Sequence, residues 1–545
     1  MKKLIYTLFL SLFFFGAKAQ KVSLQDSSRS VEITPYGVKL YHNKPTYDSS
    51  NLGSGVGVLK KLIAGKANTV VGDSNATNLS NSSRNTLVGV GIMKKANSGN
   101  ANTVLGALAA GTNQGNNLIA MGFGAAGDIV NVDYNISLGT LAGTGAQVDN
   151  RIAIGGLAGY SGFNTNSVLV GHSAGSSILV GVRNVAIGAQ ALNAAPGNGG
   201  DLSAQNIIAV GHKALLYGAN SSESIGIGYN TLSANEPPYV FTKNIAVGYE
   251  AMQKHTRGNS NIAVGRRTMR NDIGSLSNIA IGYESLYNTN YGNHNLAIGA
   301  YSGGFGYGDD QAYGFTNGTN NIFIGYGAAA GSKNQIIANV AIGSLTLQNL
   351  DGLAQANVAV GWSAGKTADF DSRMTFIGAE TDLASSTTSF IQNSTAIGYG
   401  AIITASNQIV FGNDDVDKVE GKVAWSLYSD RRLKSNINYS DALGLELIKA
   451  LKPAFYIYKT DKNKRKQLGI LADDLEQYLN QKNVQFSALR IADNKQKTKS
   501  VAYAELALPL INAVQTLDKK LTQSTQNWTP LDPKTFTVNN DQNSY

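Results

Sequence analysis

Ser429 and Lys434 are the two side chains in this sequence that we connect with bond breaking. A serine hydroxyl is a weak nucleophile that needs an adjacent base, and an uncharged lysine amine can act as that base. Arg431 and Arg432 lie between them and, as like charges, favour the uncharged amine. Positions five apart point about 140° apart on an ideal helix, so the pair can meet only if Ser429 precedes the helix. The spacing alone also fits a helix cap beside a solvated basic face.

The composition limits which other functions are open to the chain. It has 545 residues, of which 43% are hydrophobic and 15% charged, with 61 glycines, 9 prolines and no cysteine. The length predicts at least two folding units, and the lack of cysteine excludes disulfides, thiolate metal sites and cysteine nucleophiles. Of the net charge of +9, residues 429–545 hold 18 Lys/Arg against 12 Asp/Glu. The long first part has no basic stripe, so we expect no nucleic-acid partner.

A short repeat fills most of the chain. The segment Asn-Ile-Ala-Val-Gly at residues 244–248 recurs at 261–265, and close variants always end in glycine. Between the marker glycines, from Gly72 to Gly412, fourteen of nineteen intervals are 16 to 18 residues. This period is too short for helix-pair repeats or propeller blades and is typical of one turn of a β-solenoid.

Large and small apolar residues alternate within each repeat. Ile245 and Val247 belong to one face of a strand, Ala246 and Gly248 to the other. A solenoid interior covers only one face, so either the small face or its large-residue opposite is expected to pack on identical subunits. We further expect the leading asparagines to form a ladder, and a later apolar pair, as in Ala251-Met252, to form a second strand in each coil.

The periodicity changes after Gly412. Ser440 is predicted to cap a helix that Pro453 ends, followed by a strand from Phe455 to Lys459. A strand from Leu468 to Ala472 and a helix from Asp473 to Leu479 come next. In the last helix, apolar residues are spaced 4-3-4-3-4, which predicts either a coiled-coil seam or an amphipathic helix on its own domain. These residues are Tyr503, Ala507, Leu510, Val514, Leu517 and Leu521.

Two resemblances cover most of the sequence. The Asn-x-Ala-x-Gly repeats of residues 66–412 resemble the head of YadA-like trimeric autotransporter adhesins, which implies a left-handed parallel β-roll that trimerises. Those adhesins end in a membrane-anchoring β-barrel, and this sequence lacks such C-terminal strands.

The C-terminal module is similar to the intramolecular chaperone domain of phage endosialidase tailspikes. The resemblance lies in Ser-Asp-Arg-Arg-Leu-Lys at 429–434, Leu-Lys-Pro at 451–453 and Leu-Gly-Ile-Leu-Ala-Asp-Asp-Leu-Glu at 468–476. It implies trimerisation followed by single-turnover self-cleavage in cis, in which Ser429 attacks the Tyr428 carbonyl and Lys434 takes its proton. Asp473 stands where that family usually has Gln.

The first 19 residues indicate export. Lys2 and Lys3 precede an apolar run from Leu4 to Phe15, and Ala17-Lys18-Ala19 ends the pattern of a secretory signal. We therefore expect a secreted or cell-surface protein. No later stretch has the roughly 20 apolar residues of a transmembrane helix.

Other candidate sites are weaker. His172 and His212 each follow a marker glycine but lie two coils, or about 10 Å, apart, so they are not expected to share a metal ion. We expect no metal and no cofactor. Two long insertions, one with Tyr239 and Phe241 and one with Tyr307, Asp309 and Asp310, could hold sugar or pack on the solenoid.

Together these observations predict a mainly β homotrimer: a parallel β-solenoid followed by a small α+β chaperone that ends in a coiled-coil helix. The expected divisions are a signal peptide at 1–19, an N-terminal segment at 20–65, repeats at 66–412, a connector at 413–428 and a chaperone/autoprotease at 429–545. The expected function is an adhesin-like fibre that binds a surface glycan or protein. The alternatives are a tailspike-like fibre that binds or degrades glycans, and a scaffold without a ligand.

Overall fold

The computed structural model describes residues 22–25, 29–34, 37–42 and 50–526, except for 146–147, 179, 194–202, 218–220, 234–239, 256, 305–317, 333, 353, 385–389, 424 and 493–495. The predicted signal peptide lies outside the described residues. The chain forms two compact units, residues 1–372 and 373–545. Across the described part, no helix combines the length and the apolar character that crossing a membrane requires.

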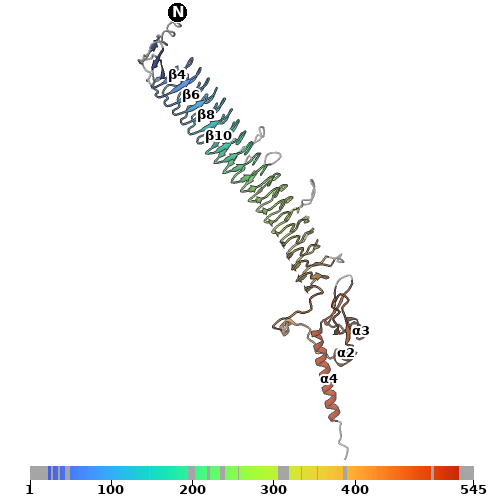
Figure 1. Ribbon diagram of the computed structural model, residues 1–545. Coiled ribbons are helices and arrows are strands. Elements are labelled where there is room, and N and C mark those ends of the chain that lie inside the picture. The colour runs from blue at the N-terminus through green and yellow to red at the C-terminus, as the bar shows by residue number, and fades with distance from the viewer. Residues whose placement is uncertain are drawn as a thin grey trace, which may run out of the picture. The chain divides into compact units, whose positions relative to one another are not determined.

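The first unit is mainly a parallel β-solenoid (Figure 1). Three antiparallel strands, β1 (Val22–Gln25), β2 (Arg29–Thr34) and β3 (Gly37–His42), precede it. Each solenoid strand pairs in parallel with the next in unshifted register, so that Ala246 faces Ala263 and Ala263 faces Ala280. The ladder consists of β4 (Leu52–Ser54), β5 (Thr69–Val71), β6 (Thr86–Val88), β7 (Thr103–Leu105), β8 (Ile119–Met121), β9 (Ile136–Leu138), β10 (Ile152–Ile154), β12 (Val168–Val170), β14 (Val185–Ile187), β16 (Ile208–Val210), β17 (Ile225–Ile227), β19 (Ile245–Val247), β21 (Ile262–Val264), β22 (Ile279–Ile281), β23 (Leu296–Ile298), β24 (Ile322–Ile324), β25 (Val340–Ile342) and β26 (Val358–Val360).

The solenoid starts one turn earlier than the repeat pattern indicated. Strand β4 pairs with β5, and Asn51 accepts a hydrogen bond from the backbone N–H of Asn68 at 2.9 Å, as later asparagines do for their neighbours. This turn, Asn-Leu-Gly-Ser-Gly, has no central alanine and ends in Gly55. Its central residue is Gly53, where a Cβ would lie 3.2 Å from Val58 Cγ1.

In most turns a small residue lies in the middle of the strand and inside the coil, and in a few turns a large one such as Val70, Leu87 or Phe323 takes this place. Ala246, Ala263 and Ala280 are fully buried, whereas the flanking large residues, such as Ile279 and Ile281, are 38% and 39% exposed. The marker glycines make the close stacking possible. Gly282 has φ +132°, and a Cβ there would lie 2.5 Å from the carbonyl oxygen of Gly299 in the next turn. Of the two alternatives for the unsatisfied apolar face, the structure therefore leaves the large-residue face outside.

The expected second strand in each coil is wrong. The second apolar pair lies in a run of turns, where Met252 and Leu286 take left-handed backbone angles of φ +53° and +49°. Their side chains are nevertheless fully buried and fill the interior opposite the alanines. Additional pairing comes from another part of the repeat: β11 (Asn164–Thr165), β13 (Val180–Val182) and β15 (Ser203–Gln205) pair in parallel, as do β18 (Val240–Thr242) and β20 (Arg257–Asn259).

The asparagine ladder is confirmed. The side-chain oxygen of Asn244 accepts the backbone N–H of Asn261 at 2.9 Å, and the same bond recurs through Asn278, Asn295, Asn321, Asn339 and Asn357. The left-handed residue at this corner is the one before the asparagine, for example Ser277 with φ +56°, and not the asparagine itself. The asparagine is instead needed for its amide, which satisfies buried backbone groups.

The second unit begins with three more solenoid strands, β27 (Thr375–Ile377), β29 (Thr395–Ile397) and β31 (Ile409–Phe411), and a short side ladder of β28 (Asp382–Leu383) and β30 (Ile402–Ile403). The C-terminal module follows. Its elements are η1 (Arg431–Leu433), α2 (Leu445–Ala450), β32 (Ala454–Tyr456), β33 (Gln467–Gly469), α3 (Ala472–Lys482), β34 (Leu489–Ile491), β35 (Lys499–Val501), η2 (Tyr503–Leu506) and α4 (Ala507–Gln526). Strands β32 and β33 pair antiparallel, as do β34 and β35.

A small core holds this module together. Leu447 of α2, Leu475 and Leu479 of α3, and Ala488 are buried together. The predicted cap is wrong, because Ser440 accepts the N–H of Ala442 and α2 begins only after Gly444. The side-chain amide of Asn512 in α4 bonds the carbonyl of Leu443 at 3.0 Å and so holds this loop in place before the helix starts.

Candidate functional site

A short turn positions the predicted nucleophile and base. Asp430 caps the 3-10 helix η1 by accepting the backbone N–H of Arg432 at 2.9 Å, and it forms an ion pair with the Arg432 guanidinium at 2.6 Å. The side-chain and backbone hydrogen bonds from Arg432 lower the pKa of Asp430. Asp430 therefore stays ionised and holds the chain in a single tight turn, which closes when the N–H of Lys434 donates to the carbonyl of Arg431.

The turn brings Ser429 and Lys434 into contact. Lys434 Nζ donates a hydrogen bond to Ser429 Oγ at 2.7 Å. Ser429 precedes the cap of η1, and Lys434 lies just after the helix in extended backbone with φ −118° and ψ 139°. The geometric condition set by the five-residue spacing is thus met, and the distance suits proton transfer between the two groups. Their roles in cleavage remain a prediction.

The site is open to solvent in the single chain. Tyr428, whose carbonyl precedes Ser429, is 97% exposed, and Ser429 and Lys434 are exposed as well. Of the two expected like charges, Arg432 is matched by Asp430. The chain alone supplies the contact between the two side chains but does not shield it from water.

Asp473 stands where the endosialidase-type chaperones that this module resembles usually have Gln, and it forms an ion pair with Lys499. Lys499 of β35 contacts Asp473 at 2.5 Å and Glu476 at 2.6 Å. Hydrogen bonds to Asp473 and then Glu476 raise the pKa of Lys499. The carboxylate thereby links α3 to the β34–β35 hairpin, which the sequence patterns did not predict.

The other predicted candidates do not form a site in the described residues. His172 is exposed, and its Nδ1 lies 3.0 Å from the carbonyl oxygen of Gly156. His212 is exposed and stacks on Tyr229, with ring centroids 5.4 Å apart. Tyr307, Asp309, Asp310 and Tyr239 lie outside the described residues, and of Phe241 only the strand position is described.

The sequence patterns did not predict a buried polar cluster in the solenoid. His255 Nδ1 lies 2.7 Å from Asp272 Oδ2, both side chains are fully buried in the solenoid, and Ser275 donates to the same carboxylate. The hydroxyl contacts aspartate rather than histidine, so this is not a nucleophile–base arrangement. The available signal was the separation of 17 residues, which equals one repeat and places the two residues on adjacent turns.

The comparison with protein families bears on the C-terminal module. Residues 429–483 match the peptidase family described as "chaperone of endosialidase", and the match starts at Ser429. No curated protein matches the chain. The chain therefore carries an endosialidase chaperone domain at its C-terminal end and a β-solenoid body before it.

Proposed function

We propose that this protein is an exported homotrimeric fibre, with YadA-like head repeats acting in attachment and a C-terminal chaperone that aligns three chains. The chaperone then cuts itself off between Tyr428 and Ser429. The observation that carries the proposal is the 2.7 Å contact between Ser429 and Lys434 at the start of the matched chaperone domain.

Support for self-association comes from the outward face of the solenoid. In turn after turn, two large aliphatic residues of the strand stay partly exposed, as with Ile208 at 38%, Ile227 at 40% and Ile281 at 39%. A continuous aliphatic stripe of this length is unusual on a monomer and marks an interaction surface. Because each turn repeats the same side chains, the surface that fits it best is another copy of itself.

Support also comes from α4. Its buried residues, Pro509 and Ala513, face the rest of the module, where α4 packs on α2. The predicted seam lies elsewhere: Leu510, Val514 and Leu517 are 51%, 58% and 51% exposed. The exposure of these three residues supports our proposal that the seam makes contacts among three chains.

The proposed cleavage proceeds by acyl transfer. Neutral Lys434 takes the proton of the Ser429 hydroxyl while Oγ bonds to the carbonyl carbon of Tyr428. The bond from that carbon to the Ser429 nitrogen breaks, and the nitrogen leaves with the proton from Lys434. Water then hydrolyses the ester, giving the Tyr428 carboxylate and restoring the serine hydroxyl. The reaction occurs once per chain.

The exposure of the site gives assembly a role in this reaction. A charged amine loses its proton more easily when it is removed from water. Ser429 and Lys434 are exposed in the single chain, so we propose that neighbouring chaperones cover them in the trimer. Cleavage would then occur only after the trimer has formed.

The cleavage test is the intact mass of protein secreted by wild type and by Ser429→Ala. We expect the wild type to yield a fragment of residues 429–545 and Ser429→Ala to stay at full length. Ser435→Ala is the matched control, because it removes a hydroxyl one residue beyond Lys434. A full-length wild type would contradict the proteolytic part of the proposal.

The trimer test is the solution mass of folded protein. We expect three chains, and we expect Leu510→Lys with Leu517→Lys to yield monomers in the Ser429→Ala background. A well-folded wild-type monomer would refute the assembly.

A second candidate function is glycan binding or degradation by a tailspike-like fibre. It is favoured by a column of rings along successive turns, in which Tyr229 stacks on Tyr249 at 5.1 Å and Arg266 lies 5.5 Å from the Tyr249 ring. Tyr229 and Tyr249 are 41% and 43% exposed. A glycan array with wild type and Tyr249→Ala tests binding, and release of reducing sugar tests degradation.

A further inference from the structure

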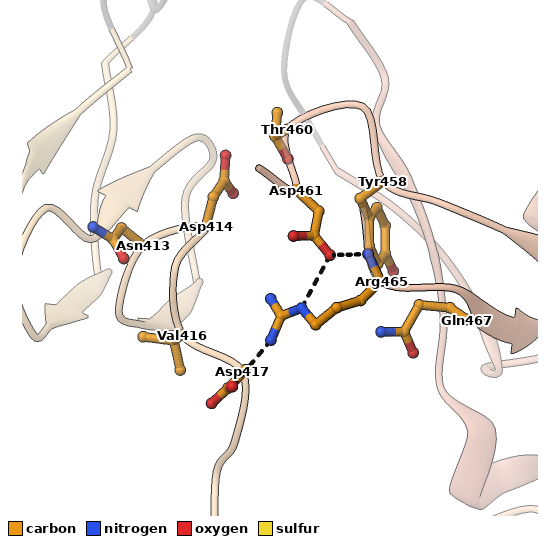
Figure 2. Close-up of a pocket in the computed structure, with 9 residues that line it drawn as sticks. All are labelled: Asn413, Asp414, Val416, Asp417, Tyr458, Thr460, Asp461, Arg465 and Gln467. Atoms are coloured by element: carbon orange, nitrogen blue, oxygen red, sulfur yellow. Dashed lines mark hydrogen bonds and ion pairs between the residues drawn. The ribbon is translucent and has the colours of Figure 1, made fainter. Parts of the chain in front are cut away.

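A polar cleft lies between the connector that follows the last solenoid strand and the turn that joins β32 to β33. Figure 2 shows the two sides of this cleft, with the connector on one side and the turn on the other. It is lined by Asn413, Asp414, Val416, Asp417, Tyr458, Thr460, Asp461, Arg465 and Gln467. The connector lies upstream of the proposed cleavage site, and the turn lies downstream of it.

Ion pairs cross this cleft. Arg465 Nη1 lies 3.1 Å from Asp417 Oδ2, and Lys462 Nζ lies 3.7 Å from Asp415 Oδ1 (Figure 2 shows the first). Both connector carboxylates are solvent-exposed, at 61% and 66%. These contacts join two segments that cleavage between Tyr428 and Ser429 would separate into different polypeptides.

The turn is organised before it meets the connector. Asp461 is only 7% exposed and accepts hydrogen bonds from the Arg465 side chain and from the backbone N–H groups of Asn463 and Arg465, at 2.9 to 3.0 Å. Burial opposes ionisation of Asp461, but these bonds outweigh it and lower its pKa. The ionised Asp461 therefore holds the Arg465 guanidinium with one side directed at the connector.

The two segments have opposite charge. Residues 413–420 contain four carboxylates and one lysine, whereas residues 459–466 contain five cationic side chains and one carboxylate. Such complementary segments attract each other over a distance that shrinks as salt is added.

We infer that residues 413–420 and 459–466 form an electrostatic latch that keeps the chaperone on the end of the solenoid after the chain has been cut. This inference rests on the proposed self-cleavage. Individual exposed ion pairs are weak, so one latch exchanges rapidly, while three latches in a trimer hold together by multivalency. Ionic strength then decides between retention and release.

The test is gel filtration of cleaved wild-type protein at two salt concentrations. We expect residues 429–545 to elute with the solenoid at about 20 mM salt and separately at about 500 mM, where the screening length falls from about 20 Å to about 4 Å. Asp417→Asn should lower the salt concentration of release at least two-fold. Asp414→Asn removes the same charge from the segment without breaking either ion pair, so it should lower the salt concentration of release by clearly less than Asp417→Asn does.

Reversal of the charge sharpens the result. Asp417→Arg should release the chaperone even at low salt, whereas Asp417→Glu, which keeps the charge at this exposed position, should retain it. Equal retention at both salt concentrations, or equal effects of Asp417→Asn and Asp414→Asn, would overturn the latch.

A separate cut distinguishes failure of the latch from failure of self-cleavage. A specific protease sequence inserted after Gly421, in exposed chain, allows Ser429→Ala protein to be cut from outside. The same salt dependence is expected after this cut. If wild type stays uncut but the externally cut protein shows salt-dependent release, self-cleavage is wrong and the latch stands. If both proteins are cut and release does not depend on salt, the latch is wrong.

Discussion

Replacing Asn278 with alanine should open the solenoid locally. Asn278 is fully buried, and its side-chain amide donates to the carbonyl of Gly292 at 2.7 Å while its oxygen accepts the backbone N–H of Asn295 at 2.8 Å. Alanine leaves both backbone groups without these partners inside the coil. An unsatisfied buried group costs roughly 1 to 3 kcal/mol, so we expect a loss of about 4 kcal/mol in the free energy of local unfolding.

Hydrogen exchange is the appropriate assay because it resolves the stability of individual turns. Amides of β22 and β23 in Asn278→Ala should exchange roughly a thousand-fold faster, because each 1.36 kcal/mol corresponds to about a ten-fold change, whereas those of distant turns should change little. Asn349→Ala is the control: it removes one hydrogen bond, to the carbonyl of Lys366, at an exposed position where water can replace it. A similar small effect of both substitutions, below about 1 kcal/mol, would refute the view that the buried ladder holds the turns together.

Three further predictions concern other contacts. Gly282→Ala should cost several kcal/mol in urea unfolding, because its φ is +132° and a Cβ would lie 2.5 Å from the Gly299 carbonyl oxygen, whereas Gly421→Ala, with 3.6 Å to its nearest neighbour, should cost under about 1 kcal/mol. His255→Ala should destabilise by about 2 to 3 kcal/mol, since it removes the 2.7 Å partner of the fully buried Asp272 side chain, and a cost below about 1 kcal/mol in the same assay would show that the pair is unimportant. Hydrogen bonds from Ser487 and then Arg490 lower the pKa of Glu505, so its contribution to stability is present above the ordinary glutamate pKa and is lost as the pH falls through the folded pKa. Acid unfolding followed by circular dichroism should thus show a weaker pH dependence for Glu505→Gln, and an unchanged curve would argue against this role.

The solenoid was predictable because each of its rules repeats. The marker glycines and asparagines recur with the period of the turn, and a pattern sampled many times is not hidden by local exceptions. The second apolar pair was assigned to a strand because its residues, such as Met252, favour burial, and burial does not distinguish a strand from a turn. The left-handed backbone at Met252 shows that this segment is a turn and not a strand. The alternation of large and small residues does not predict such a backbone angle.

In the C-terminal module, the contact between Ser429 and Lys434 was easier to predict than the structure around it. The Ser429–Lys434 contact depends only on the short local turn that Asp430 caps. The spacing of the two residues in the sequence was therefore enough to say where each must lie relative to the helix. The start of α2 depends instead on Asn512, about 70 residues away in sequence, which holds the preceding loop. The pairing of Arg465 with Asp417 is equally non-local, although the opposite charges of the two segments were visible in the sequence.

A uniform solenoid face gives a trimer strength but no register. Ile245 and Val247 of one turn are followed by the same residue types, Ile262 and Val264, in the next, so three chains shifted by one turn would bury almost the same aliphatic surface. Only the end turns would lose their partners. A device that fixes the axial alignment must therefore lie outside the regular turns, where the residues do not repeat.

The C-terminal module has the properties that this alignment needs. Its core residues and the exposed seam of α4 occur once per chain, so three modules can associate in a single register. Alignment that starts there would pass along the solenoid turn by turn, since each turn offers an edge for the next. In the proposed trimer, slipping by one turn would require all of the contacts between the solenoids to break at once, so the chains would keep their register after the chaperone is cut. Cleavage after assembly would then leave the three chains aligned. Cleavage before assembly would remove the module that aligns them, and the chains could associate in several registers.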